Sequence, residues 1–287
     1  MATDLSTTER TISGLDALEL GGGNGESRAA KVWAATWPKL LALAIAIGLW
    51  QVVVWSGWRD EYILPSPATV GKALADTLPT DHFWQSLANT ARRALSGYAL
   101  AIVIGALLGV AVARIRILRA AIGSMITALQ TMPSIAWFPL AIVLYQLTES
   151  AITFVVVLGA APSIANGVIA GVDYVPPLLL RAGRNIGARG FRLYRFVIGP
   201  ASLPHIVSGL KQGWAFCWRS LMAGELLVII PGHPAIGTSL QQAREELRYA
   251  DMMAVMVIIL VLGLVVDVAF GAADRAVRRR WGITDNR

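Results

Sequence analysis

Six apolar stretches, each long enough to cross a lipid bilayer, most constrain the fold of this 287-residue chain. A bilayer core of about 30 Å requires roughly 20 apolar residues in a helix, because each helical residue adds about 1.5 Å. The windows lie near 40–58, 95–113, 120–147, 151–172, 205–229 and 251–273. None of them alternates like a strand. Pro133 and Pro139 are expected to kink the third window. We therefore predict an all-α, polytopic membrane protein with six transmembrane helices.

The composition agrees with a membrane protein and argues against nucleic-acid binding. Only 15% of the residues are charged and 55% are hydrophobic, whereas a soluble domain carries about a quarter charged residues. The net charge of +7 comes from arginines and lysines in short segments beside apolar windows, as in cytoplasmic loops. The single cysteine, Cys217, lies inside a window, so no internal disulfide can form.

The distribution of basic residues predicts the orientation, because lysine and arginine resist translocation across the membrane. Basic residues gather before the first window, in the second and fourth loops and after the sixth window: Arg28, Lys31, Lys39; Arg114, Arg116, Arg119; Arg181, Arg184, Arg189, Arg192, Arg195; Arg275, Arg278, Arg279, Arg280. Both termini are therefore expected in the cytoplasm. Arg92 and Arg93 lie at the outer entry to the second window, where we expect their long side chains to reach the lipid headgroups.

The apolar windows and the distribution of charge divide the chain into three predicted segments. Residues 1–38, which include the flexible stretch GGGNGESR and no signal peptide, are predicted to form a largely disordered cytoplasmic tail. Residues 39–280 form the transmembrane domain, with a cytoplasmic loop at 173–204. Residues 281–287 are a second cytoplasmic tail.

The segment 181–204, RAGRNIGARGFRLYRFVIGPASLP, contains more than the positive-inside rule explains. That rule accounts for its five arginines but not for its glycines and prolines. Gly187 and Gly190 permit a backbone turn or a close approach that a β-carbon would block. We predict a short helix, a turn and a second helix at the membrane surface.

This loop resembles the cytoplasmic loop of inner-membrane permeases of binding-protein-dependent ABC importers. The family pattern reads Glu-Ala-Ala, three residues, Gly, nine residues, Ile, one residue, Leu-Pro. Here Ala182, Gly187 and Pro200 fit and Val197 is a conservative variant, whereas Arg181, Gly183 and Gly199 replace the acid, the second alanine and the leucine. In the family this loop is the coupling helix that enters a groove on the ATP-binding subunit. The resemblance thus implies coupling roles for Arg181, Ala182, Gly183, Arg184, Gly187, Arg189 and Pro200.

Further stretches are similar to permeases for nitrate, sulfonate, taurine and bicarbonate. They include YILPSP at 62–67, TMPSIAWFPLAIVLYQLTESA at 131–151 and GWAFCWRSLMAGEL at 213–226, the last being most similar to alkanesulfonate permeases. The resemblance implies a type I ABC importer permease in the bacterial plasma membrane. It also implies a homodimer with two ATP-binding subunits and an extracytoplasmic substrate-binding protein. The expected substrate is an aliphatic sulfonate, with nitrate, taurine or bicarbonate as alternatives.

The sequence contains no catalytic or metal motif. No phosphate loop of the form G-x-x-x-x-G-K-[ST] occurs, so ATP and magnesium are expected on the partner subunit and no cofactor on this chain. His82, His205 and His233 lie in separate segments, without metal-ligand spacing. A secondary transporter or channel is the alternative class, but it favours an inverted internal repeat, and none is clear.

Charges inside the windows are the candidates for the transport path. Arg219, in the middle of the fifth window, is costly unless it faces protein or a water-filled cavity. It either forms a buried pair with Glu225 or offers its planar donors to a passing anion. Thr131, Met132 and Trp137 of the third window are further candidates for this path.

A second pair of intramembrane charges is interpreted as structural. Lys211 in the fifth window and Asp267 in the sixth are expected at nearly the same depth. Opposite charges inside a membrane commonly pair with one another. We therefore predict an ion pair between these two helices, with no role in transport.

Overall fold

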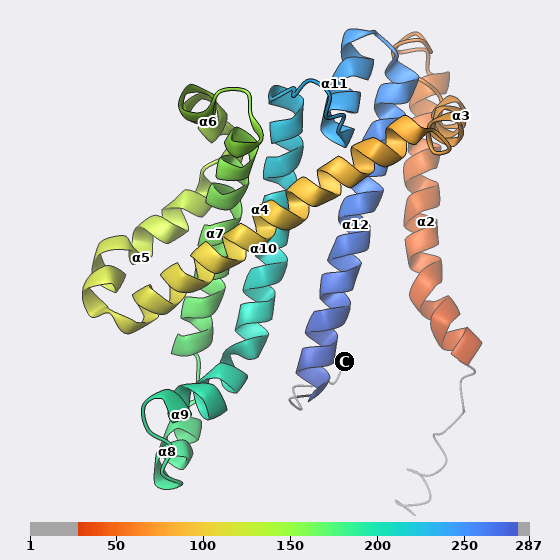
Figure 1. The fold of residues 1–287 in the computed structure, drawn as a ribbon. Coiled ribbons are helices and arrows are strands. Elements are labelled where there is room, and N and C mark those ends of the chain that lie inside the picture. Colours follow the sequence, from red (N-terminus) through yellow and green to blue (C-terminus); the bar gives the residue numbers. More distant parts are fainter. Residues whose placement is uncertain (1–27, 281–287) are drawn as a thin grey trace, which may run out of the picture. The chain divides into compact units, whose positions relative to one another are not determined.

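Figure 1 shows the computed structural model, which describes residues 28–280. Most of the predicted tail 1–38 and the whole of the predicted tail 281–287 lie outside the described residues. Among the described residues every regular element is a helix and no strand occurs, so the predicted all-α fold is confirmed. The chain divides into two units, Met1–Glu61 and Tyr62–Arg287.

The first unit contributes one long helix, α2 (Arg28–Trp55). Its segment Thr36–Trp55 is apolar enough to cross a membrane, and none of those residues is buried. A helix that is hydrophobic all round and exposed on every side is suited to contact with lipid. The first predicted window therefore corresponds to this helix.

The second unit holds the remaining elements. In chain order these are α3 (Pro67–Thr77), α4 (Asp81–Arg114), α5 (Arg116–Thr131), η1 (Ser134–Trp137), α6 (Phe138–Tyr145), α7 (Glu149–Asp173), α8 (Pro177–Asn185), α9 (Phe191–Leu193), the π-helical η2 (Tyr194–Ile198), α10 (Gly199–Leu227), α11 (Ile236–Glu245) and α12 (Tyr249–Arg280). The sequence windows did not predict α3 or α11.

Helix α7 lies at the centre of this unit, packed along α4 on one side and α10 on the other. The main core cluster of buried residues is drawn largely from these three helices. The backbones of α7 and α10 touch, since a β-carbon on Gly167 would lie 2.6 Å from the Cα of Gly209. Small residues allow such close packing between helices in a membrane, where lipid supplies no hydrophobic drive for association.

The third predicted window is broken rather than kinked. Helices α5 and η1–α6 meet at an angle of 106°. Pro133 has no N–H and restricts the residue before it, and Met132 accordingly leaves the helical region with ψ at 128°. Pro139 was also expected to kink this span, but it lies in the first turn of α6, where a proline is tolerated.

Four helices are long and apolar enough to cross a membrane, and the bent pair makes a fifth if it is one span. These four are the segments Thr36–Trp55, Asp81–Arg114, Glu149–Asp173 and Tyr249–Arg279. Helix α10, the fifth predicted window, is not among them. It carries Lys211, Arg219 and Glu225, and it packs extensively against α7. The count of six spans stays a prediction.

Candidate functional site

The arginine-rich loop folds as a short helix, a turn and a second helix. Helix α8 begins at Pro177 and ends at Asn185, and α9 with η2 leads directly into α10. Gly187 has φ at +85° and Gly190 has φ at +52°, a region that side chains with a β-carbon rarely adopt. The two glycines therefore make the turn between the helices, as the sequence predicted.

Gly183 has a different role from Gly187. A β-carbon on Gly183 would lie 2.8 Å from Val197 Cγ2 and 3.0 Å from Leu193 Cδ1, so its absence lets α8 pack directly onto η2. A β-carbon on Gly187 would meet nothing within 4 Å. Within this chain, Gly187 is thus needed for its backbone conformation and Gly183 for close packing.

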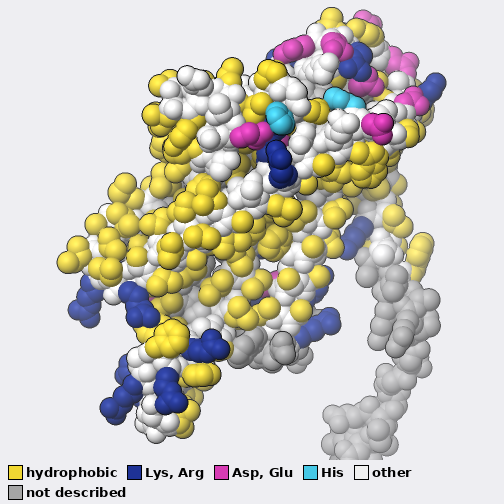
Figure 2. Space-filling view, in the orientation of Figure 1, with side chains coloured by type: hydrophobic (Ala, Val, Ile, Leu, Met, Phe, Trp, Pro, Cys, Tyr) yellow, Lys and Arg dark blue, Asp and Glu magenta, His cyan; other side chains and the backbone are white. Residues whose placement is uncertain are grey.

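The surface of this loop combines positive charge with exposed apolar side chains. All five arginines of the loop are exposed, and among the described residues none of them forms an ion pair with a carboxylate. Beside them Ile186 is 84% exposed, Phe191 78% and Phe196 66%. Figure 2 shows basic side chains at the end that carries α8, whereas acidic side chains lie mainly at the end that carries α11. Exposed apolar groups rimmed by charge are typical of a protein docking surface.

A hollow of about 290 Å³ lies within this surface, beside the glycine turn. It is lined by Ile186, Gly187, Ala188, Arg192, Phe196 and Val197. Ala182 and Arg184 lie on the exposed side of α8 and Arg189 in the turn, while Pro200 begins α10 and is half-buried. Six of the seven predicted coupling residues are therefore at least partly exposed on this helix–turn–helix segment, whereas Gly183 is buried.

Arg93 belongs to a buried network, and the expectation that it reaches the lipid headgroups was wrong. Its side chain is 5% exposed. Its Nη2 lies 2.6 Å from Glu149 Oε1 at the start of α7, and its Nη1 lies 3.2 Å from Glu225 Oε1 on α10. A guanidinium at this depth is stabilised when carboxylates surround it.

Glu225 is fully buried and accepts three kinds of hydrogen bond. Besides Arg93, the hydroxyl of Thr90 and the backbone N–H of Gly237 donate to its carboxylate, each over 3.0 Å. The N–H of Ile236 donates to Thr90 Oγ1 over 3.0 Å. This network joins α4, α10 and the start of α11. The carboxylate of Glu225 therefore pairs with Arg93, and the alternative pairing with Arg219 is wrong.

Arg219 lies on an exposed face of α10 without a carboxylate partner among the described residues. Its Nε donates to the carbonyl of Ala215 over 3.1 Å, and its guanidinium lies 4.8 Å from the ring centre of Phe216. The remaining donors of this fork are available to another molecule.

The candidates of the third window lie at the break between α5 and α6. Thr131 and Met132 are exposed, and the Thr131 hydroxyl donates to the carbonyl of Ala128 over 2.7 Å. Trp137 is half-buried against the main core. Because η1 packs against both α7 and α10, the structure brings this break next to the helix that carries Arg219.

Lys211 and Asp267 connect α10 to α12. The Lys211 Nζ lies 3.2 Å from Asp267 Oδ1, and the two side chains are 40% and 54% exposed. Among the described residues, no group of three or more His, Cys, Asp or Glu side chains could hold a metal ion.

Comparisons with known proteins find transport permeases that are similar to this chain. Residues 101–280 match a family described as binding-protein-dependent transport system inner membrane component. A probable ABC transporter permease protein of Brucella melitensis biotype 1 is 30% identical over 236 residues, which is 82% of this chain and 94% of that protein. The taurine transport system permease protein TauC of Escherichia coli K12 is 26% identical over 81% of this chain and 86% of its own length. SsuC of the same strain, provisionally named an aliphatic sulfonates transport permease protein, is 29% identical over 82% and 88%.

Solved structures share the fold. A bacterial ABC transporter involved in the import of the acidic polysaccharide alginate superposes with a TM-score of 0.56, at 15% identity, over 86% of this chain and 99% of that chain. The inward-facing MetNI methionine ABC transporter gives a TM-score of 0.51, at 24% identity, over 68% of this chain and 93% of that chain.

Proposed function

Since the chain belongs to the family of binding-protein-dependent transport system inner membrane components and is an ABC importer permease subunit, we propose that it imports a small oxyanion. An aliphatic sulfonate is the first candidate, and taurine, nitrate or bicarbonate are the alternatives. The observation that supports an anionic substrate is the position of Arg219. This exposed guanidinium on α10 has no carboxylate partner among the described residues. The relatives named for taurine and aliphatic sulfonates support the same class of substrate.

The proposed assembly contains two copies of this chain, two ATP-binding subunits and an extracytoplasmic binding protein. ATP and magnesium belong to the ATP-binding subunits, because this sequence contains no phosphate loop. The exposed arginines and apolar side chains of the α8–η2 surface support that surface as the place where an ATP-binding subunit docks. The permease itself carries out no chemical step.

The contacts of the loop suggest how movement reaches the transport path. Gly183 packs α8 onto η2, and η2 continues without interruption into α10. A displacement of α8 by the ATP-binding subunit therefore moves the base of α10, the helix that carries Arg219. Closure of the two ATP-binding subunits would draw the two loops together and turn the cavity outward, a rigid-body transition between two packed states.

The orientation of this assembly places α8 in the cytoplasm. A reporter fused after Arg280 is expected to be cytoplasmic, and one inserted near Pro79 is expected to be outside, because basic residues concentrate at the α8 end. Alkaline phosphatase and fluorescent-protein fusions measure the two positions independently. An external reporter after Arg280 would contradict the orientation.

Substitution of Arg219 tests the oxyanion path. Arg219→Met is expected to lower the uptake of an aliphatic sulfonate by about tenfold or more, because a charge-assisted contact contributes about 1.5–3 kcal/mol. Arg219→Lys keeps the charge but loses the fork of donors, so an intermediate loss is expected. The measurement is uptake into proteoliposomes that contain the complete complex, with assembly checked by size-exclusion chromatography.

The matched control is Arg244→Met, which removes an exposed arginine of α11 and should leave uptake near the wild-type level. Full uptake by an assembled Arg219→Met complex would rule out Arg219 as the anion contact. The candidate path would then pass Thr131, Met132 and Trp137 at the break in the third window.

A further inference from the structure

Two arginines at the junction of α4 and α5 contact the loop 173–204, here named the docking loop. Arg114 is the last residue of α4, and Arg119 lies in the first turn of α5. The sequence predicts no role for them beyond the positive charge of a cytoplasmic loop. In the structure each of the two guanidinium groups has a defined partner in the docking loop.

Arg114 stacks on Tyr194. Its guanidinium carbon lies over the Tyr194 ring, 3.4 Å from the ring centre. Tyr194 is the first residue of η2 and is half-buried. A planar guanidinium is attracted to the face of an aromatic ring and stacks on it, which an ammonium group cannot do. This contact attaches the end of α4 to the start of η2.

Arg119 forms a two-point ion pair with Asp173, the last residue of α7. Its Nη2 lies 2.8 Å from Asp173 Oδ1, and its Nη1 lies 3.1 Å from Oδ2. The two side chains are 43% and 38% exposed, so the pair contributes little to stability. Its two parallel hydrogen bonds nevertheless fix the relative orientation of the two groups. This contact attaches the start of α5 to the start of the docking loop.

The same arginine also caps α4. The Arg119 Nε donates to the carbonyl of Val112 over 3.4 Å, and Nη2 donates to the carbonyl of Ala113 over 3.5 Å. The last carbonyls of a helix have no partner within the helix, and arginine side chains are suited to bind them. Arg119 therefore connects the end of α4, the start of α5 and the docking loop.

These contacts join two apolar clusters that have no residue in common. Val112 and Ile126 belong to a buried cluster of α4, α5 and α7. Leu193 and Ile198 belong to a second cluster, within the docking loop, and Tyr194 packs against it. Close-packed side chains transmit displacement well, so we expect each cluster to move as one body. The side chains of Arg114 and Arg119 reach from the first body to the second.

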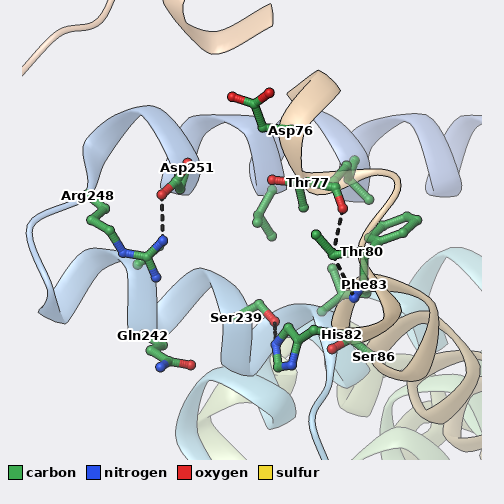
Figure 3. Close-up of a pocket in the computed structure, with 14 residues that line it drawn as sticks. Asp76, Thr77, Thr80, His82, Phe83, Ser86, Ser239, Gln242, Arg248 and Asp251 are labelled. Carbon is green, nitrogen blue, oxygen red and sulfur yellow. Dashed lines mark hydrogen bonds and ion pairs between the residues drawn. The ribbon is translucent and has the colours of Figure 1, made fainter. Parts of the chain in front are cut away.

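The opposite end of α4 has room to move. Residues of its first turns, His82, Phe83 and Ser86, line a cavity of about 280 Å³ that is also bounded by α3, α11 and α12 (Figure 3). A helix that borders a cavity meets fewer overlaps when it shifts than one that is packed on every side. A displacement of α4 from its docking-loop end could therefore be accommodated at this end.

We propose that Arg114 and Arg119 are positioning residues that transmit a movement of the docking loop to α4 and α5. This route runs beside the one through η2 into α10. Helix α5 leads to the break at Thr131 and Met132, which are candidates for the transport path. Helices α5 and α10 would then move together when a partner displaces α8. The inference rests on the proposed docking of an ATP-binding subunit at the docking loop.

The double variant Arg114→Met with Arg119→Met tests this second route. We expect it to transport at least about fivefold less butane-1-sulfonate per ATP hydrolysed, the lower end of the range for coupling between distant sites. ATP hydrolysis stimulated by loaded binding protein should persist, because Gly183 still packs α8 onto η2. The measurement is uptake and hydrolysis in proteoliposomes that contain the complete complex, with assembly checked by size-exclusion chromatography.

Conservative variants separate transmission from general damage to the fold. Tyr194→Phe should keep the wild-type ratio of uptake to hydrolysis, because it keeps the aromatic face, whereas Tyr194→Leu should lower that ratio. Exchange of the ion pair, Arg119→Asp with Asp173→Arg, should restore part of the ratio that is lost in Arg119→Asp alone. A purely structural role would not make the ratio follow the stack and the pair in this way.

The matched control is Arg116→Met with Arg275→Met, which also removes two exposed arginines. Among the described residues neither of these arginines forms an ion pair. The control should transport and hydrolyse like the wild type.

A second measurement does not depend on the identity of the substrate. Spin labels at Leu178→Cys in α8 or Ser124→Cys in α5, both exposed positions, report the distance between the two copies by electron paramagnetic resonance. Cys217, the only cysteine of the chain, is buried and does not take up the label. With ATP and vanadate both distances should change in the wild type. In Arg114→Met with Arg119→Met only the change at Leu178 should persist.

The inference would be overturned by an unchanged ratio of uptake to hydrolysis in the double variant, or by an equal loss in the control. It would also be overturned by a distance at Ser124 that changes in the double variant as in the wild type, or that does not change in the wild type. If the distance at Leu178 does not respond in the wild type, the proposed docking of the ATP-binding subunit is itself wrong.

Discussion

Arg93→Met is expected to destabilise the permease by about 3–5 kcal/mol, because it leaves the fully buried carboxylate of Glu225 without a cation. The two remaining donors to Glu225, Thr90 and the N–H of Gly237, satisfy hydrogen bonds but do not compensate the charge. Glu225→Gln should cost less, since Arg93 keeps its contact with Glu149. Thermal and denaturant unfolding of the purified chain in one detergent measures both effects.

The double variant Arg93→Met with Glu225→Gln sharpens this prediction. It removes both charges of the buried pair, so it should be more stable than Arg93→Met alone. Arg92→Met is the matched control, because Arg92 precedes Arg93 in α4 but is exposed. An Arg93→Met chain as stable as Arg92→Met would show that the buried network contributes little to the fold.

Gly187→Val is expected to abolish the stimulation of ATP hydrolysis while the permease still inserts and dimerises. Gly187 has φ at +85°, where a β-branched residue is strained by about 1–3 kcal/mol, so the turn between α8 and α9 cannot keep its form. The loss comes from the backbone and not from crowding, since a β-carbon there would meet nothing within 4 Å. The measurement is ATPase activity of the purified complex with loaded binding protein.

A graded series separates the turn from general damage to the loop. Gly187→Asn should keep part of the stimulation, because asparagine tolerates positive φ better than valine. Gly71→Ala, in α3, is the control, since Gly71 also has no atom within 4 Å of a β-carbon but has no positive φ. Wild-type stimulation in Gly187→Val would refute the role of this turn in coupling.

The sequence predicted the elements that one-dimensional patterns can specify. Apolar windows located the long helices, and Gly187 and Gly190 predicted the turn between α8 and α9, because positive φ is a local property. Helices α3 and α11 were missed, since they are short and not apolar enough to form a window. The sequence predicted that Pro133 bends the third window but not how sharply, because it does not show which neighbours replace the lost hydrogen bonds.

The buried network could not be predicted, because its members are distant in the chain. Arg93 contacts Glu149 and Glu225, which follow it by 56 and 132 residues. From depth alone we expected Arg93 to reach the headgroups, and a pair between Glu225 and Arg219 was one of two alternatives for Arg219. The choice between partners depends on the packing of α4, α7 and α10. The sign of a charge and its depth do not determine that packing.

ATP-driven uptake by the reconstituted complex measures whether this chain works as the permease of an ABC importer for a small oxyanion. Proteoliposomes would contain this chain and its ATP-binding subunit, with the binding protein added outside and a radiolabelled aliphatic sulfonate as substrate. We expect uptake that requires the binding protein, the ATP-binding subunit and ATP on the side of α8, and that is lost in Gly187→Val. Undiminished uptake in vesicles that lack the ATP-binding subunit would exclude an ATP-driven importer and favour a secondary transporter or channel.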